Sequence, residues 1–263
     1  MRSILKGTIS FGLVNVPVKV YSAIEEGGLS FHQVHSHDHG KIRYKRVCEL
    51  CGDTVEYADI ARAYEFDDGQ LAVITDEDIE SLPAEKSREI EVLTFVAADE
   101  LDPMVYDRSY YVAPENPAAT KPYMLLARTL ASTDRLAIVK FALRSRTRLG
   151  ALRTRKFGDR QVLMVHSLVW PSQVREPEFP LLDAKPEIKD MELAVAMQVV
   201  DAMSGQFKPE LYTDTYSEQM LELVEAKRSH DDYTPELPAA LGATDASDLL
   251  AKLQASLAVK AQA

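Results

Sequence analysis

The segment RLAIVKFALRSRTRLGALRTRKFGDRQVLMVHSLVW, residues 135–170, contains three apolar stretches separated by two short polar connections. The stretches at 135–143, 149–155 and 161–170 are rich in β-branched and other aliphatic residues, and this composition favours strands. Both connections have the length of hairpin loops. The segment therefore predicts three consecutive antiparallel strands, an arrangement typical of a barrel or a sandwich.

The residues before this segment continue the β pattern. Apolar and polar residues alternate from Thr8 to Tyr21, which is the periodicity of a half-buried strand. A short helix is expected after Thr75, whose hydroxyl is a suitable N-cap, and a longer helix is expected at 118–132. Further strands are expected at 29–35, 41–47, 70–75, 88–96 and 109–113.

The apolar pattern takes a helical period after Pro186. Helices are expected at 188–204 and 209–229, and a last one at about 247–260. One buried stripe is predicted on the first of them, formed by Met191, Val195, Val199 and Met203.

The predicted fold is mixed and mainly β, with an antiparallel β-barrel core and a helical C-terminal arm. The core is expected at 1–186, with a small Cys/His knuckle at 32–51, and the arm at 187–229. A linker at 230–246 and a C-terminal helix at 247–263 follow.

Composition and motifs exclude several classes of protein. The chain is 46% apolar and 27% charged, which is ordinary for a soluble globular protein. No run of about 18 apolar residues occurs, so no membrane span is expected, and the N-terminus lacks the pattern of a signal peptide. The sequence has no glycine-rich phosphate loop, nucleophile elbow or HExxH motif. A cytoplasmic protein without catalytic residues is the expectation.

Charge is segregated along the chain. The formal net charge is −11, which taken alone argues against nucleic acid as a partner. However, residues 49–110 hold 18 acidic and 4 basic residues, whereas residues 140–160 hold 8 basic residues and one aspartate. Because local potential steers a polyanion, the basic stretch remains a candidate nucleic-acid surface, the alternative being solvated hairpin faces with a chance bias.

Four separated motifs resemble one known family. KGTISFGLVNVPVKVYSA (6–23), RYKRVCELCG (43–52), DRSYYVAPE (107–115) and LRSRTRLGALR (143–153) are similar, in sequence and in order, to motifs of the bacterial Ku proteins. The resemblance covers about residues 2–230. It implies a β-barrel core with a helical C-terminal arm that assembles as a homodimeric ring around the ends of double-stranded DNA, in the nucleoid and without enzymatic activity.

The resemblance also implies a protein partner. A multifunctional ATP-dependent DNA repair ligase is expected to be recruited in non-homologous end joining through a region near the C-terminus. The candidate docking residues are the leucines of the last helix, Leu249, Leu250, Leu253 and Leu257. One departure is that the chain ends without the lysine-rich tail of many relatives, so any DNA function of such a tail should be absent.

A protein that accepts any DNA end must bind phosphates, because phosphate contacts carry no sequence information. Arginine suits this task since its guanidinium forks onto phosphate oxygens. Strand alternation predicts that Lys140, Arg144, Arg146 and Arg148 share one face, unless a turn resets the phase. Some of the candidates are expected to be solubilising residues instead. The candidate DNA-binding residues are Arg43, Lys45, Arg46, Lys140, Arg144, Arg146, Arg148, Arg153, Arg155 and Lys156.

The two cysteines, Cys48 and Cys51, form a CxxC motif downstream of four histidines. Two cysteines and two histidines would complete a tetrahedral structural zinc site. His35 is the first candidate among the histidines, and His37 or His39 would supply the fourth ligand. A reduced thiol pair without metal and a redox pair are the alternatives.

Two other functions stay open at this point. A β-barrel adaptor that binds proteins and not DNA would lack a salt-sensitive DNA complex. A zinc-dependent hydrolase would need three protein ligands, an open coordination position and a general acid or base, and the sequence offers no convincing base.

Overall fold

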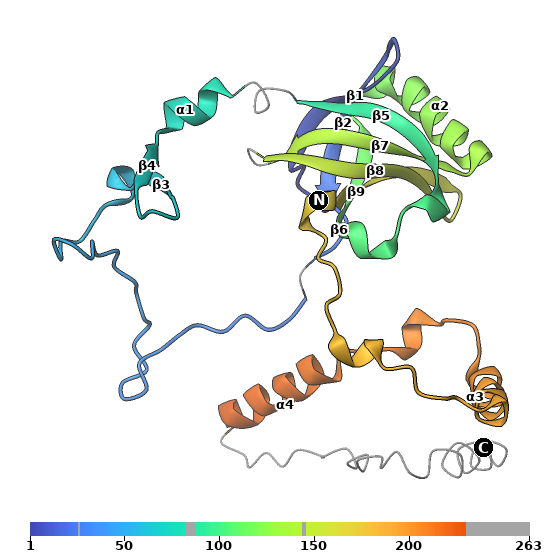
Figure 1. The fold of residues 1–263 in the computed structure, drawn as a ribbon. Helices are drawn as coiled ribbons and strands as arrows, with labels where there is room; N and C mark the ends of the chain where they lie inside the picture. Colours follow the sequence, from blue (N-terminus) through green and yellow to red (C-terminus); the bar gives the residue numbers. More distant parts are fainter. Residues whose placement is uncertain (26, 83–87, 144–145, 230–263) are drawn as a thin grey trace. The chain divides into compact units, whose positions relative to one another are not determined.

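The computed structural model describes residues 1–25, 27–82, 88–143 and 146–229 and contains a closed β-barrel (Figure 1). The strand order around the barrel is β1-β2-β6-β9-β8-β7-β5. The strands are β1 (Leu5–Phe11), β2 (Val14–Ser22), β5 (Glu89–Ala97), β6 (Tyr106–Pro114), β7 (Arg135–Leu143), β8 (Arg146–Phe157) and β9 (Arg160–Leu168).

The three strands predicted from residues 135–170 are confirmed as β7, β8 and β9. They pair antiparallel in sequence order, with Leu143 opposite Arg146 in the first hairpin and Phe157 opposite Arg160 in the second. Alternate side chains enter the buried core of the barrel, among them Phe141, Leu152 and Leu163. The residues between them therefore face outward.

The barrel is mixed, so the prediction of a purely antiparallel barrel is wrong in one place. β1 pairs parallel with β5, with Ile9 opposite Ile90, and this pair closes the barrel. The chain leaves the barrel after Ser22 and returns at Glu89. A connection of that length is free to bring a strand back in the parallel direction, which a hairpin cannot do.

The single strand expected at 8–21 is two strands. A turn at Gly12, where φ is +58°, reverses the chain between β1 and β2. Both strands carry the same alternation, so the periodicity alone did not show the turn.

Helix α2 (Pro117–Thr133) confirms the helix expected at 118–132 and packs on the barrel core. The Asn116 side chain accepts a hydrogen bond from the Ala119 N–H and caps the helix. Tyr123 donates a hydrogen bond from its hydroxyl to the Val112 carbonyl (2.7 Å) and accepts one from the Leu163 N–H (2.8 Å). Tyr123 thus joins α2 to β6 and β9.

The segment between β2 and β5 contains little regular structure. The strands expected at 29–35 and 41–47 are wrong, because only isolated bridges form, Val34 with Lys41 and Val47 with Thr54. Further along lie the two-stranded sheet of β3 (Arg62–Glu65) and β4 (Leu71–Ile74) and the helix α1 (Asp76–Ser81). The predicted cap is confirmed, because Thr75 and Asp78 form a capping box.

The chain divides into two units, one formed by residues 1–26 and 32–176 and the other by 27–31 and 177–263. The second unit holds α3 (Asp190–Met203) and α4 (Thr215–Ser229). The stripe predicted on α3 is not buried in the single chain: Met191 is 67% and Met203 65% exposed. Short 3-10 helices lie at Tyr57–Asp59, Ala98–Glu100, Pro103–Val105, Pro171–Gln173, Pro180–Asp183 and Pro209–Leu211.

Several predictions fall outside the described residues. They are the linker at 230–246, the C-terminal helix with Leu249, Leu250, Leu253 and Leu257, and Arg144 in the β7–β8 connection. None of the helices in the described ranges combines the length and the apolar character needed to cross a membrane.

Candidate nucleic-acid interface

Strand β8 carries most of the predicted DNA-binding arginines, and alternation divides them between its two faces. Arg153 and Arg155 point outward, because the intervening Leu152 lies in the barrel core. Both arginines are exposed. They stand opposite Met164 and Val162 of β9. The outer wall of the barrel therefore presents two adjacent guanidinium groups to solvent.

Lys140 shares the face of Arg153 and Arg155, so the single phase predicted for Lys140, Arg146 and Arg148 is wrong. Leu143 lies opposite Arg146, and this register pairs odd residues of β7 with even residues of β8. The turn between the strands therefore places even residues of β7 and even residues of β8 on opposite faces. The Lys140 ammonium also lies 3.6 Å from a Glu91 carboxylate oxygen, which partly neutralises its charge.

Arg148 is held by a carboxylate within the barrel. It shares its face with the buried Phe141, and one of its terminal nitrogens, Nη1, lies 3.3 Å from Asp107 Oδ2. Arg146, one step toward the turn on the same face, is exposed, as is Lys156 near the far end of β8. Arg148 is therefore the least available of the described basic candidates on this strand.

Arg155 is positioned by aromatic neighbours. Its guanidinium carbon lies 5.1 Å from the centre of the Phe157 ring, within range of a cation–π contact. Phe157 in turn meets Tyr111 of β6 edge to face, with ring centres 5.7 Å apart. These contacts restrict the guanidinium before any ligand binds.

His166 of β9 lies on the same outward face as the two arginines, opposite Ala151. Its Nδ1 atom is 2.8 Å from the Ser109 hydroxyl, and its ring meets Tyr106 edge to face. Burial first, and then the positive charges of Arg153 and Arg155, together lower the pKa of His166 to about 4. His166 is therefore neutral at pH 7.

This histidine predicts a loss of stability in weak acid. Its folded pKa of about 4 is below the unfolded value of about 6.5, so the unfolded chain binds the proton more tightly. The neutral ring therefore makes its full contribution to the free energy of unfolding above pH 6.5. This contribution falls by up to about 3 kcal/mol as the pH drops toward 4. Urea unfolding across this range should show a smaller pH dependence in His166→Gln than in the wild type. Equal slopes for the two proteins would contradict this account.

The remaining basic candidates, Arg43, Lys45 and Arg46, immediately precede the CxxC turn and are exposed. The Arg46 guanidinium lies 5.3 Å from the centre of the Tyr57 ring. The other two side chains extend into solvent. This segment is a basic strip with one cation held against an aromatic ring.

The four predicted zinc ligands do not form one group. Among the described residues, no cluster of three or more His, Cys, Asp or Glu side chains is arranged to hold a metal ion. The bridges at Val34 and Val47 fold the histidine loop and the cysteine turn into separate hairpins. His35 Nδ1 lies 3.0 Å from Asp38 Oδ1, and His37 and His39 belong to the same loop. The set of His35, His37, Cys48 and Cys51 therefore does not fit zinc in this conformation.

The cysteine turn has an ordered backbone of its own. Cys48 and Cys51 are free thiols, and Gly52, at φ +75°, donates a hydrogen bond from its N–H to the Cys48 carbonyl. Hydrogen bonds from the Cys51 and Leu50 N–H groups and from the Cys51 thiol lower the pKa of Cys48. The turn favours a thiolate at Cys48 and supplies two sulfur ligands at most.

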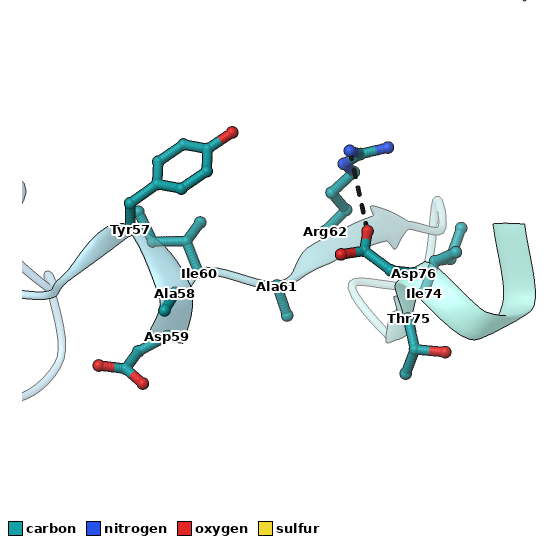
Figure 2. Close-up of a pocket in the computed structure, with 9 residues that line it drawn as sticks. All are labelled: Tyr57, Ala58, Asp59, Ile60, Ala61, Arg62, Ile74, Thr75 and Asp76. Carbon is teal, nitrogen blue, oxygen red and sulfur yellow. Dashed lines mark ion pairs between the residues drawn. The ribbon is translucent and has the colours of Figure 1, made fainter. Parts of the chain in front are cut away.

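A shallow hollow of about 420 Å³ lies beside the β3–β4 sheet. Figure 2 shows its lining, in which the Arg62 guanidinium faces the Asp76 carboxylate at 4.0 Å. Tyr57, Ile60 and Ile74 supply much of the remaining surface. Because its arginine is already paired with a carboxylate, the hollow has no net positive charge to attract phosphate.

Two further outward lysines belong to no run of basic residues in the sequence. Lys6 and Lys19 stand opposite each other on β1 and β2, on the outer wall of the barrel. Each is isolated in the sequence, between residues that enter the core, such as Val18 and Val20. Strand alternation was the signal that could have identified them.

Comparison with known proteins gives a consistent family. The family model described as "Ku70/Ku80 beta-barrel domain" matches residues 10–195. The non-homologous end joining protein Ku of Mycolicibacterium smegmatis is 57% identical over 261 residues, which cover 98% of this chain and 82% of the relative.

Two further relatives extend the comparison. The non-homologous end joining protein Ku of Mycobacterium tuberculosis is 56% identical over 266 residues, which cover 100% of this chain and 97% of the relative. Protein Ku of Mycobacterium phage Omega is 46% identical, over 99% of this chain and 87% of the relative. With the closed barrel and these matches together, the chain belongs to the Ku family.

Proposed function

We propose that this chain binds the ends of double-stranded DNA without sequence preference, as a non-enzymatic protein of non-homologous end joining. Membership of the Ku family supports the pathway, because the relatives are named for it. The observation that carries the DNA contact is the pair of exposed guanidinium groups, Arg153 and Arg155, on the outer wall of a rigid barrel.

The chemistry of this pair suits phosphate. Two outward arginines on one strand are about 6.6–6.8 Å apart, from the strand rise of about 3.3–3.4 Å per residue. Two nucleotides along one DNA strand advance by about 6.8 Å along the helix axis, at about 3.4 Å per nucleotide. Arg155 is held over Phe157 and so loses less side-chain entropy on binding. Binding through phosphates alone accepts an end of any sequence.

A homodimeric ring is part of the proposal. Helices α3 and α4 contain no buried residue in the single chain, and large apolar side chains such as Val200 (63%) are exposed. An apolar surface of this kind marks an interaction site. We propose that the arm at 187–229 of a second copy of the chain packs against this apolar surface. The ligase is proposed to bind nearer the C-terminus, at Leu249, Leu250, Leu253 and Leu257.

Threading onto an end is tested by the order of addition. A linear duplex with biotin at both ends is capped with streptavidin either before or after the protein is added. Capping first should prevent binding, whereas capping second should trap the protein so that competitor DNA does not release it. Equal binding and equal release in the two orders would contradict threading.

Metal removal tests the remaining role of the cysteine pair. Because the described residues supply no complete zinc site, EDTA dialysis is expected to change DNA affinity by less than about twofold. The measurement is a titration of labelled duplex before and after dialysis, with the metal content recorded by mass spectrometry. A large loss of DNA affinity that only added zinc restores would instead support a zinc site formed by the four predicted ligands.

A further inference from the structure

A polar network at a bulge joins three neighbouring strands of the barrel. Asp107 and Arg108 of β6 together face the single residue Ser167 of β9, since Tyr106 pairs with Leu168 and Ser109 with His166. The extra residue of a bulge re-aims the side chains beside it. Asp107 Oδ2 accepts hydrogen bonds from Arg148 Nη1 (3.3 Å) and from the Ser167 hydroxyl (3.1 Å).

Ser167 stabilises the bulge itself. It is fully buried, and its oxygen accepts a hydrogen bond from the Arg108 N–H at 3.0 Å. A buried backbone N–H without a partner would be costly, so the hydroxyl offsets the loss of a ladder hydrogen bond. Ser167 lies opposite Gly150, two residues after Arg148 on β8. The group of Asp107, Ser167 and Arg148, here called the clasp, therefore ties β6 to β8 across β9.

The clasp commits Arg148 to an internal partner. The Arg148 side chain is 31% exposed, and its charge already faces the Asp107 carboxylate. A guanidinium held in this way gains little from a phosphate, because it would first have to give up a carboxylate. Arg146, by contrast, is exposed on the same face, at the end of the hairpin where Leu143 pairs with it.

We infer that Arg148 is a positioning residue for DNA binding and not a phosphate contact: with Asp107 and Ser167 it fixes β8 close to the β7–β8 turn, so that Arg146 projects in one direction. This inference rests on the proposed function. Removing a negative charge normally strengthens the binding of a polyanion. Here the removal of the Asp107 charge is expected to weaken DNA binding.

The experiment compares Asp107→Asn, Arg148→Met and Arg153→Gln with the wild type in duplex-DNA titrations over a range of salt. Asp107→Asn and Arg148→Met are each expected to weaken binding by about 3- to 10-fold while the slope of log affinity against log salt stays unchanged. Arg153→Gln is the control for a direct contact and should lower the slope by about 2 for a dimer. The charge-swapped pair Asp107→Arg/Arg148→Asp should recover part of the lost affinity.

Opposite results would overturn the inference. If Arg148 binds phosphate, Asp107→Asn frees it and binding becomes tighter, whereas Arg148→Met lowers the slope by about 2. Wild-type DNA affinity in a folded Asp107→Asn variant would show that the clasp does not position Arg146 for DNA binding. If Asp107→Asn does not fold, Arg148→Met still distinguishes the two roles by its slope. Failure of the wild type to bind any duplex would instead refute the proposed function.

Discussion

Replacing both Arg153 and Arg155 with glutamine is expected to weaken the binding of duplex DNA by about 10- to 100-fold at low salt. A dimer loses four outward guanidinium groups in this variant, and each contact with a phosphate releases counterions. The slope of log affinity against log salt should fall by about 3 to 4. The measurement is a fluorescence-anisotropy titration of a short duplex at several salt concentrations.

The matched control is Arg175→Gln/Lys185→Gln, which removes the same charge from exposed positions outside the barrel strands. It should leave the slope within about 1 of the wild-type value. If the control loses as much affinity as the barrel variant, net charge and not a located interface governs binding. The outer wall of β8 would then have no special role.

Gly7→Ala is expected to destabilise the barrel by about 3 kcal/mol or more. A Cβ atom at Gly7 would lie 2.2 Å from the backbone oxygen of Arg88, at the start of the return to β5. That oxygen accepts a hydrogen bond from the Thr8 N–H, so the clash lies beside the parallel β1–β5 pair that closes the barrel. Backbone on both sides leaves no flexible side chain to move away. Thermal unfolding should show the loss as a lower Tm.

The control for this variant is Gly205→Ala, where an added Cβ meets nothing within 4 Å and φ is not positive. It should change the free energy of unfolding by less than about 0.5 kcal/mol. A Gly7→Ala protein as stable as the wild type would mean that β1 and β5 are further apart than described.

Much of the barrel was predictable because its signals are local. The hairpins of residues 135–170, the α2 helix and the Thr75 cap each depend on neighbours within a few residues. The parallel β1–β5 pair was not predictable, because it joins strands separated by residues 12–88 and no periodicity specifies such a partner.

The candidate site also depends on contacts between distant parts of the sequence, which local patterns do not predict. Alternation along β8 places Arg148 and Arg153 on opposite faces, but the register of the β7–β8 hairpin decides which of them shares the face of Lys140, since a turn of one more residue would exchange the faces. The Asp107–Arg148 pair depends on a bulge and on strand order, and neither leaves a pattern in the sequence. In the cysteine and histidine segments, ligand spacing suggested zinc, but spacing does not show whether two local hairpins approach each other.

The most direct test of DNA-end binding uses one duplex in two forms, linear and covalently closed into a circle, in mobility-shift assays at about 50 and 200 mM salt. A complex is expected with the linear form only, and its affinity should fall by about 10³–10⁵ between the two salt concentrations if the dimer contacts about 6–10 phosphates. Equal binding to the linear and circular forms would contradict threading over an end.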